Sequence, residues 1–458
     1  MDKRFQPVTS SFRDPDGFVF RDESNSIYRQ LNISYTENYQ LLINSGLYKK
    51  LTDSGKLISH EEKPEVICEK ENHFKTILPE QIPFISYPYE WCFDQFKDAA
   101  LLTLEVMKLS LEHGMSLKDA TPFNVQFFNG RTVFIDTCSF EKYEEGKPWI
   151  AYKQFCETFF APLLLMSYVH PEMNQLLLSH PEGIPLKMAS NMLPLRSYFN
   201  VPVLLHLHFH AGFRNKKKGN NSLKMPKQRL LMLIDSLRSA VEKLKVRKMS
   251  SDWQDYYSET ILSETYINEK KKVVNEILDT ISVKTAIDIG CNDGMFSQML
   301  YGKGIHTIAI DPDSNCINSF YELCKRKDLK NIYPLTVDIL NPSPSIGWNN
   351  TERNSFFKRS KSELVLALAV VHHLAIGKNI SFEMTAQLFS SIGNSLVIEF
   401  VPKSDEKMKQ MLQNRKDIFT SYNEENFERV FGKYFQLVSK NKISKTGRII
   451  YHFEKISS

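Results

Sequence analysis

The stretch Thr285-Ala-Ile-Asp-Ile-Gly-Cys-Asn-Asp-Gly294 decides the fold of the second half of this chain. A β-branched apolar run contains Asp288, two glycines then flank three short residues, and a helical pattern follows over residues 295–300. This order predicts a strand, a tight glycine turn and a helix N-terminus, which hold a nucleotide-like cofactor at the carboxyl edge of a parallel sheet. A pyrophosphate loop needs a glycine at the middle position, where this chain has Asn292. The spacing therefore predicts a cofactor without a pyrophosphate.

Further apolar runs predict the other strands of the sheet. The first two runs end in Asp311 and Asp338, and Asp311 lies twenty-one residues beyond Gly290. Open α/β folds place a carboxylate there against ribose hydroxyls, because it can accept both O–H donors. Since the runs alternate with helical stretches, we predict a doubly wound, Rossmann-like α/β sheet. The runs cover residues 306–311, 333–338, 364–371, 395–401 and 448–453, the last as an edge strand.

Composition limits the class of protein. A chain of 458 residues predicts two or three domains, and its formal net charge of +5 is too small to indicate nucleic-acid binding. Seven cysteines without a Cys-x-x-Cys pair indicate a reduced protein rather than a disulfide scaffold or zinc module. No run is apolar enough for a signal core or a membrane span. We therefore expect a cytoplasmic protein with no membrane partner.

The domain boundary is predicted near residue 245. Residues 212–222 are basic and rich in glycine and asparagine, which indicates an exposed loop or linker. Apolar residues then recur at helical spacing over 230–244 and again over 266–278. We therefore predict an N-terminal domain over 1–211, a linker and helix over 212–250, and a cofactor-binding domain over 251–458.

The glycine loop and the two strand-end acids, in this order and spacing, resemble the cofactor motifs of class I S-adenosylmethionine-dependent methyltransferases. The resemblance covers about residues 255–458 and makes S-adenosylmethionine the expected cofactor. It implies that the loop glycines admit the methionine moiety, that Asp311 binds the ribose, and that Asp338 binds the adenine amino group. Each acid alone could instead cap a helix. The expected cofactor-binding residues are Asp288, Gly290, Asn292, Asp293, Gly294, Asp311 and Asp338.

Candidates for acceptor chemistry follow the fourth and fifth strands. His372 or His373 could act as base or position the acceptor, since imidazole titrates near neutrality, although either could be structural. Glu399 lies in an apolar run, so it should face the site or pair with a cation. The long connection over residues 341–360 could form a lid or acceptor wall, or a surface loop packed by its own aromatics; the residues in question are Trp348, Arg353, Phe356 and Phe357.

The N-terminal half carries a second pattern. Asp119, Asn124 five residues later, a hairpin with an Asn-Gly turn, and Asp136 after an apolar strand resemble the catalytic loop and metal-binding strand of the protein kinase and aminoglycoside phosphotransferase superfamily. The resemblance implies that Asp119 takes the place of the base and that Asn124 and Asp136 take those of Mg²⁺ ligands. The glycine-rich phosphate loop is missing, and Thr137 follows the second acid. We therefore expect a degenerate α+β kinase-like domain that either binds substrate or positions a partner.

His206, His208 and His210 would share one face of a strand, whereas in a helix only His206 and His210 would do so. No cysteine or carboxylate follows at ligand spacing, so we expect no metal site there.

The sequence thus predicts methyl transfer from S-adenosylmethionine to a small-molecule or metabolite acceptor, with the N-terminal domain aiding acceptor recognition. The whole arrangement resembles bacterial two-domain methyltransferases that include nodulation-related proteins, which implies the tailoring of a secondary or cell-surface metabolite. One alternative is a bifunctional kinase and methyltransferase that binds ATP and Mg²⁺ in the N-terminal domain. Another is a non-enzymatic binding module that uses the cofactor sheet as a scaffold.

Overall fold

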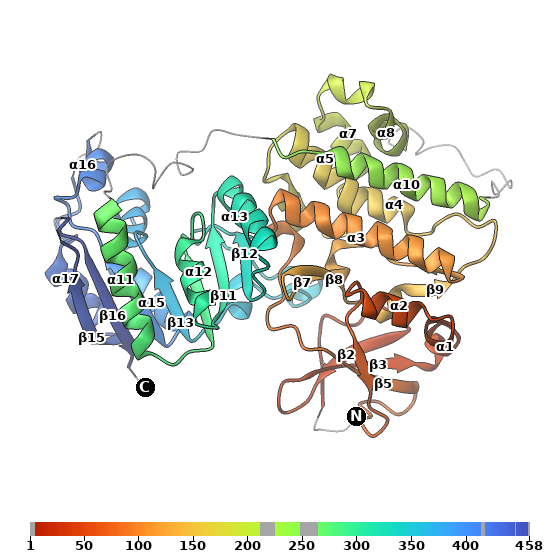
Figure 1. The fold of residues 1–458 in the computed structure, drawn as a ribbon, viewed down its shortest axis with the longest axis horizontal. Helices are drawn as coiled ribbons and strands as arrows, with labels where there is room; N and C mark the ends of the chain where they lie inside the picture. The colour runs from red at the N-terminus through yellow and green to blue at the C-terminus, as the bar shows by residue number, and fades with distance from the viewer. Residues whose placement is uncertain (1–4, 211–224, 248–263, 414–416, 445, 457–458) are drawn as a thin grey trace. The chain divides into compact units, whose positions relative to one another are not determined.

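The computed structural model describes residues 5–210, 225–247, 264–413, 417–444 and 446–456 (Figure 1). Its contacts divide the chain into two units. Unit 1 consists of Met1–Lys248 with Ser343–Ser355, and unit 2 of Met249–Pro342 with Phe356–Ser458. The predicted linker over 212–222 lies outside the described residues. Within the range predicted for the cofactor domain, Ser343–Ser355 groups with unit 1 instead.

Unit 1 combines a five-stranded antiparallel sheet with a helical part. The strand order is β1-β2-β3-β5-β4, and the helices α1 and α2 follow β3 in the sequence. The sheet strands are β1 (Gln6–Pro7), β2 (Gly17–Arg21), β3 (Ile27–Asn32), β4 (His60–Glu62) and β5 (His73–Pro79). The helices are α1 (Thr36–Asn44), α2 (Leu47–Asp53), α3 (Phe93–Glu112), α4 (Tyr152–Phe155), α5 (Ala161–Tyr168), α6 (Leu176–Ser179), α7 (Leu186–Met192), α8 (Val201–Val203) and α10 (Lys227–Lys243).

Two short antiparallel pairs follow α3 and carry the polar motif of unit 1. Strand β6 (Met115–Leu117) pairs with β9 (Phe140–Lys142), and β7 (Val125–Phe128) pairs with β8 (Arg131–Phe134). The β7–β8 turn is the predicted Asn-Gly turn, with φ of 51° at Asn129 and 75° at Gly130. Left-handed values at both positions define the hairpin turn that matches strand twist. The two acids of the motif therefore lie just before and just after a fixed hairpin.

Unit 2 is built around a seven-stranded sheet of order β12-β11-β10-β13-β14-β16-β15. The first five strands in this order are parallel, and β16 is antiparallel to both of its neighbours. The strands are β10 (Thr285–Ile289), β11 (His306–Asp311), β12 (Ile332–Thr336), β13 (Leu364–Ala367), β14 (Ser395–Phe400), β15 (Phe435–Lys442) and β16 (Ile449–Lys455). The helices are α11 (Glu264–Thr280), α12 (Met295–Gly302), α13 (Ser314–Lys327), α14 (Phe356–Arg359), α15 (Phe382–Ile392), α16 (Glu406–Leu412) and α17 (Glu424–Phe431).

The predicted Rossmann-like α/β sheet is confirmed, with one error at its edge. The run over 448–453 forms β16, which is not an edge strand because it pairs with both β14 and β15. The edge strand is β15, which the sequence analysis missed. Most of its side chains are exposed or half-buried, so it has no apolar run to mark it.

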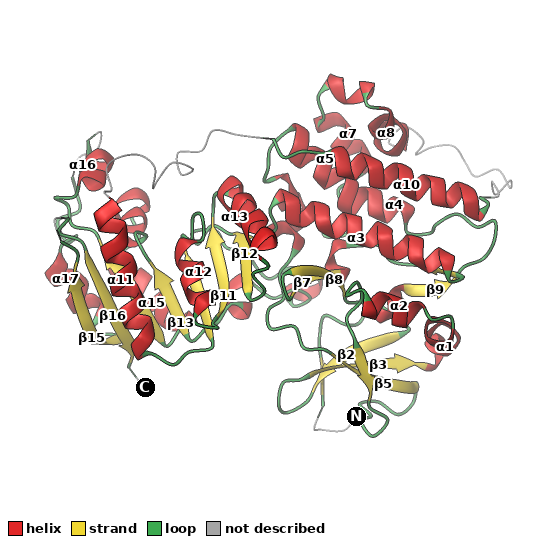
Figure 2. Cartoon of the chain, viewed as in Figure 1, coloured by secondary structure: helices red, strands yellow, loops and turns green. Residues whose placement is uncertain are grey.

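The two faces of the sheet bury different side chains. Helices α11 and α12 cover one face through a cluster that includes Val274, Phe296 and Leu300 against Leu366 and Val397 of the sheet. Aromatic rings of α15 and α17 pack with rings of β14 and β16; these rings are Phe382, Phe400, Phe427, Phe431, Tyr451 and Phe453. Figure 2 shows the strands of this sheet accompanied by helices, as a doubly wound fold requires.

Among the described helices, no segment has the length and apolarity needed to cross a bilayer. All seven cysteines are buried.

A buried charge cluster joins α11 to the end of the sheet. Glu399 on β14 is fully buried and accepts hydrogen bonds from Tyr266 Oη (2.6 Å) and Lys270 Nζ (2.7 Å), both on α11. Arg448 donates to Tyr266 Oη (2.9 Å) and forms two hydrogen bonds with Asp405 (2.7 and 3.0 Å). A buried carboxylate is tolerable only when it is paired and hydrogen-bonded. The cluster therefore fixes α11 across the strands.

Replacing Lys270 with Met should strongly destabilise the protein, because the Glu399 carboxylate would lose its ammonium partner without reaching water. We expect the free energy of unfolding to fall by about 3–5 kcal/mol, measured by chemical denaturation of the full chain. Lys272→Met is the matched control on the same helix, because the Lys272 side chain is 75% exposed. Equal stability of the two variants would contradict the role of the cluster.

Candidate functional site

The site lies where the strand order of unit 2 reverses. Strand β10 pairs with β11 on one side and β13 on the other, and these strands are parallel, so their carboxyl ends meet at one edge. Open α/β sheets bind ligands in the crevice at such a reversal. A cavity of about 550 Å³ lies there. It is lined by Ile289, Gly290, Asn292, Ile310, Asp311, Pro312, Val337, Asp338, Ile339, Leu340, Leu368, Ala369, Val370, His373, Leu374, Gly377, Lys378 and Met411.

The turn after β10 has a conformation that few residues adopt. The backbone φ is 72° at Gly290, 49° at Asn292 and 77° at Gly294, all in the left-handed region. A Cβ on Gly290 would lie 2.9 Å from Val370 Cγ2, and one on Gly294 would lie 2.1 Å from the Phe320 ring. Gly290 therefore keeps the cavity wall open, whereas Gly294 is needed for the packing of α13 against the turn.

Hydrogen bonds join this turn to the end of β11. The amides of Gly290 and Cys291 both donate to the Ile310 carbonyl, at 2.9 and 3.0 Å. The Asn292 amide donates to Asp311 Oδ2 at 3.0 Å, and the Asp313 amide to Asp311 Oδ1 at 2.9 Å. Each Asp311 oxygen keeps acceptor capacity, since a carboxylate oxygen has about two lone-pair sites. Burial raises the pKa of Asp311 to about 6, although the two amides lower it.

Four of the expected cofactor residues line the cavity, and three do not. Gly290, Asn292, Asp311 and Asp338 line it. Asp288 lies behind the turn, fully buried, and accepts a hydrogen bond from Ser297 Oγ of α12 at 2.6 Å. Asp293 accepts from the Met295 amide at 3.2 Å, at the start of the same helix. Asp288, Asp293 and Gly294 thus shape the turn and do not form part of the cavity wall.

Of the three candidates for acceptor chemistry, one lines the cavity and two do not. His373 lines the cavity in a π-helical turn, His373–Gly377. Burial and the charges of Arg448 and Lys407 lower the pKa of His373 to about 4, so its ring is neutral near pH 7. His372 is fully buried behind it, with ring centres 4.1 Å apart. Glu399 is not in the cavity wall, because its two oxygens are held by Tyr266 and Lys270.

Sequence reasoning missed part of the cavity wall. Ala369, Lys378 and Met411 line it, although no local pattern marks them. Ala369 follows β13 with a φ of 56°, which is rare for a residue with a Cβ and costs roughly 1–3 kcal/mol. Backbone strain of this kind gathers at functional sites, but it becomes visible only in the structure. The aromatic residues proposed as a lid, Trp348, Phe356 and Phe357, do not line this cavity.

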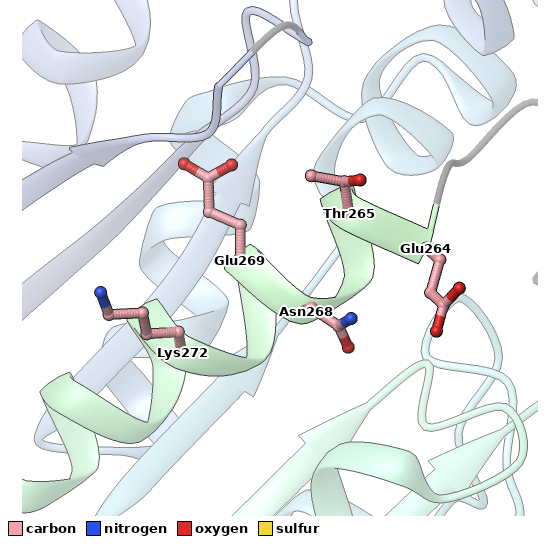
Figure 3. Close-up of a pocket in the computed structure, with 5 residues that line it drawn as sticks. All are labelled: Glu264, Thr265, Asn268, Glu269 and Lys272. Carbon is pink, nitrogen blue, oxygen red and sulfur yellow. The ribbon is translucent and has the colours of Figure 1, made fainter.

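A hollow of about 470 Å³ on α11 is a weaker candidate. Figure 3 shows its five lining residues along this one helix: Glu264, Thr265, Asn268, Glu269 and Lys272. Side chains from a single helix surface do not converge on a ligand as those of the strand-end cavity do. The strand-end cavity is therefore the better candidate for the cofactor site.

Unit 1 has a polar cavity of its own, of about 320 Å³. Asp119, Asn124 and Asp136 all line it, together with Arg29 and Lys118 and residues of the loop between β1 and β2. Asp136 forms an ion pair with Arg29 on β3. Asn124 Nδ2 donates to Asp119 Oδ2 at 3.3 Å, and Asp119 Oδ1 is buried without a hydrogen-bond partner among the described residues. Burial, with the charge of Asp136, raises the pKa of Asp119.

The three histidines of the 206–210 run are held by hydroxyl groups. Tyr152 Oη lies 2.8 Å from His206 Nδ1 and 3.2 Å from His210 Nε2. His208 lies between Ser190 Oγ (2.7 Å) and Ser197 Oγ (2.9 Å). Within the described part of the chain, no group of three or more His, Cys, Asp or Glu side chains is arranged to hold a metal ion. These imidazoles pack the helical part of unit 1.

The fold and the strand-end cavity define an α/β protein with a Rossmann-like cofactor sheet. The chain is 32% identical to nodulation protein NoeA of Rhizobium meliloti (strain 1021) over 460 residues, which is 98% of this chain and 96% of NoeA. The chain therefore belongs to the NoeA family. No protein-family model matches it.

Solved structures of methyltransferases resemble part of the chain. The N-methyltransferase NodS from Bradyrhizobium japonicum WM9, in complex with S-adenosyl-L-homocysteine, is 12% identical with a TM-score of 0.32, over 45% of this chain and 100% of NodS. Magnesium protoporphyrin IX methyltransferase (ChlM) from Synechocystis PCC 6803, with bound SAH, is 14% identical with a TM-score of 0.33, over 46% of this chain and 90% of ChlM.

The cavity fits S-adenosylmethionine, the expected cofactor. Its volume of about 550 Å³ suits a ligand of that size. Its wall is apolar apart from a few polar groups, of which the Asp311 and Asp338 carboxylates can accept from hydroxyl and amino groups. Gly290 leaves free the space beside Val370 that a Cβ would fill.

Replacing Asp288 with Asn should stabilise the ligand-free protein more at high pH than at low pH. Burial raises the pKa of Asp288 to about 7, although the Ser297 hydrogen bond lowers it. Because the folded-state pKa is raised, the stability contributed by the protonated acid is complete below about pH 4 and is lost as the pH rises towards 7. Asn keeps the neutral form, so its advantage over Asp should grow by up to about 4 kcal/mol between pH 4 and pH 8. Chemical denaturation across this range measures it, and a pH-independent difference would contradict the burial argument.

Proposed function

We propose that the chain transfers the methyl group of S-adenosylmethionine to a small-molecule or metabolite acceptor. The observation that carries this proposal is the convergence of Gly290, Asn292, Asp311 and Asp338 on one cavity, with His373 on the same wall. A non-enzymatic module would not need a strained turn, two strand-end acids and an imidazole on the same wall. The chain's relative NoeA is named only as a nodulation protein, so the acceptor class is part of this proposal.

The polar groups that carry this proposal have distinct roles. Asp311 accepts the ribose hydroxyls through the lone pairs that the amides of Asn292 and Asp313 leave free. Asp338, whose Oδ1 accepts from the Leu340 amide at 2.9 Å, accepts the adenine amino group. The open backbone at Gly290 faces the methionine moiety. Asp288 acts indirectly, by fixing the start of α12 through Ser297.

The chemistry asked of the chain is modest. Bound S-adenosylmethionine supplies a methyl group that its sulfonium already activates. The cavity wall must therefore hold the acceptor in line and exclude water. His373, neutral near pH 7, can accept a hydrogen bond from the acceptor or take its proton. His372, whose ring packs against that of His373, acts as a positioning residue behind the wall, whereas Glu399 serves to hold α11 on the sheet.

We propose that unit 1 is a kinase-like domain that aids acceptor recognition. Support comes from the order of its parts: an antiparallel sheet, a helical part, and a motif carrying Asp119, Asn124 and Asp136 on one cavity. Arg29 on β3 supplies a cation to this cavity and pairs with Asp136.

Nucleotide binding by unit 1 is the second candidate function. Cations and carboxylates face each other across the cavity and neutralise each other, as in the Arg29–Asp136 pair. A bound phosphate could pair with the cations, while Asp136 and Asn124 could coordinate a divalent metal ion. Asp119, with one unpartnered oxygen among the described residues, would then face the hydroxyl that accepts a phosphoryl group.

Calorimetry with S-adenosylmethionine and S-adenosylhomocysteine tests the methyltransferase proposal. We expect both to bind the full chain. Gly290→Arg should abolish binding because the side chain would fill the cavity. Asp311→Ala should weaken it roughly 10- to 100-fold, since hydrogen bonds to a charged group contribute about 1.5–3 kcal/mol.

The control is Asp328→Asn, an exposed residue that does not line the cavity and should leave the affinity unchanged. His373→Ala should bind S-adenosylhomocysteine as the wild type does, because His373 serves the acceptor. Absence of binding by the wild type would overturn the proposal.

Nucleotide binding is tested by titrating the chain with a non-hydrolysable ATP analogue with and without Mg²⁺. The second candidate predicts Mg²⁺-dependent binding that is lost in Asp136→Asn and kept in Asp53→Asn, a surface control on α2. Thermal unfolding of Asn124→Ala with and without the analogue covers the case in which Asp136→Asn fails to fold. If no analogue binds, the second candidate function is wrong, and acceptor recognition remains the proposed role of unit 1.

A further inference from the structure

An exposed row of apolar side chains lies on the helical part of unit 1. Val201, Leu205 and Phe209 recur at every fourth residue of a continuous helix, which consists of α8 and a π-helical turn, Leu204–Phe209. Side chains four positions apart lie on one face of a helix, and all three are exposed. A surface helix normally turns a polar face to water. The outer face of this helix is apolar instead.

The 3₁₀-helical turn before this helix carries further exposed apolar side chains. It spans Leu195–Phe199 and packs against α8 and the π-helical turn. Leu195 is 83% exposed and Phe199 is 88% exposed, so neither side chain packs into the core. Single exposed apolar residues are common, but a group of them on adjoining elements marks an interaction surface. We call this group the apolar surface of unit 1; its members are Leu195, Tyr198, Phe199, Val201, Leu205 and Phe209.

The helix that presents this surface is held firmly from its inner side. His206 and Leu207 are buried, and His206 Nε2 lies 3.0 Å from Ser236 Oγ on α10. The Tyr198 ring stacks on the buried His208 ring, with centres 3.7 Å apart. Figure 1 shows α7 and α8 at the end of the helical part opposite to the antiparallel sheet of unit 1. The apolar side chains therefore project from a fixed helix rather than from a fraying one.

The sequence around the apolar surface carries positive charge only. Residues 183–234 contain no Asp or Glu, whereas Lys and Arg recur throughout this stretch. Lys187, Arg196 and Arg229 are exposed, and none of them forms an ion pair with a carboxylate among the described residues. A chain with a formal net charge of only +5 thus has a long acid-free stretch around its apolar surface. Charge of one sign beside an apolar surface favours a partner of opposite charge.

We propose that the apolar surface of unit 1, together with the cations of the same stretch, binds the surface of an anionic phospholipid bilayer. The apolar side chains enter the boundary between headgroups and acyl chains, and the cations bind lipid phosphates. A second copy of the chain is a poorer occupant, because two such surfaces would bring like charges together. A contact of this kind needs no membrane-spanning segment, so the hydropathy of single runs does not predict it.

Co-sedimentation of the full chain with vesicles tests the proposal. We expect binding to vesicles of equal parts of phosphatidylcholine and phosphatidylglycerol, and at least roughly 10-fold weaker binding to phosphatidylcholine alone. Phe199→Ser should weaken binding to the anionic vesicles roughly 10-fold or more, because its side chain no longer leaves water for the bilayer. Ile33→Ser is the matched control and should bind as the wild type does, since Ile33 is 60% exposed just after β3, outside the apolar surface.

A second pair of variants tests the role of charge. Arg196→Gln with Arg229→Gln should weaken binding to the anionic vesicles about 10- to 30-fold and leave binding to neutral vesicles unchanged. Lys50→Gln with Lys70→Gln removes the same charge from exposed positions elsewhere in unit 1 and should have little effect. Because all of these side chains are exposed, thermal unfolding of each variant should match that of the wild type.

Three outcomes would overturn the proposal. The first is a wild-type chain that binds neither kind of vesicle, and the second is wild-type binding by both Phe199→Ser and the double arginine variant. The third is a dimer in sedimentation equilibrium that Phe199→Ser dissociates, because it would assign the apolar surface to a second copy of the chain.

Discussion

The buried carboxylate of Glu399 sets a condition that much of unit 2 must meet. A charge on a strand covered on both faces is tolerated only with cations and donors in fixed positions. Tyr266 and Lys270 supply them from α11, and Arg448 and Asp405 complete the cluster from the other end of the sequence. These residues lie up to 182 positions apart in the chain. The requirement to pair one carboxylate thus fixes α11, β14 and β16 together and closes the apolar core between them.

The cavity at the carboxyl ends of the strands depends on backbone geometry rather than on buried charge. Three left-handed residues in the turn after β10 and one after β13 curve the chain away from the strand ends. Backbone amides of the turn donate hydrogen bonds to the Ile310 carbonyl and to Asp311. Asp311 keeps acceptor capacity beyond the amides that it binds. In the proposed function, this carboxylate holds the turn through some lone pairs and receives the cofactor through others.

The two units are not two consecutive stretches of sequence. Residues 343–355 lie between two strands of the cofactor sheet and yet fold as part of unit 1. Glu352 and Arg13, the pair that holds this segment, are 339 residues apart. A long insertion of this kind is tolerated because closing a long loop costs only slightly more entropy than closing a short one. It also means that the first unit is incomplete without a piece of the second half of the chain.

Local patterns were enough to predict most of the sheet and the geometry of its glycine turn. The strand β11, the glycine turn, the acids Asp311 and Asp338 and the Asn-Gly hairpin all depend on residues close together in sequence, whose periodicity and backbone preferences act locally. The same reasoning brought Asp119, Asn124 and Asp136 together correctly, because one hairpin connects them.

By itself, therefore, the sequence determined the class of fold and the position of the cofactor turn. Only the tertiary structure decided that β15 forms the edge, that Glu399 faces α11 rather than the cavity, and that Glu352 reaches Arg13. Each of these depends on which distant group satisfies a backbone edge or a buried charge. Partners of that kind are selected by packing in three dimensions and leave no trace in the spacing of neighbouring residues.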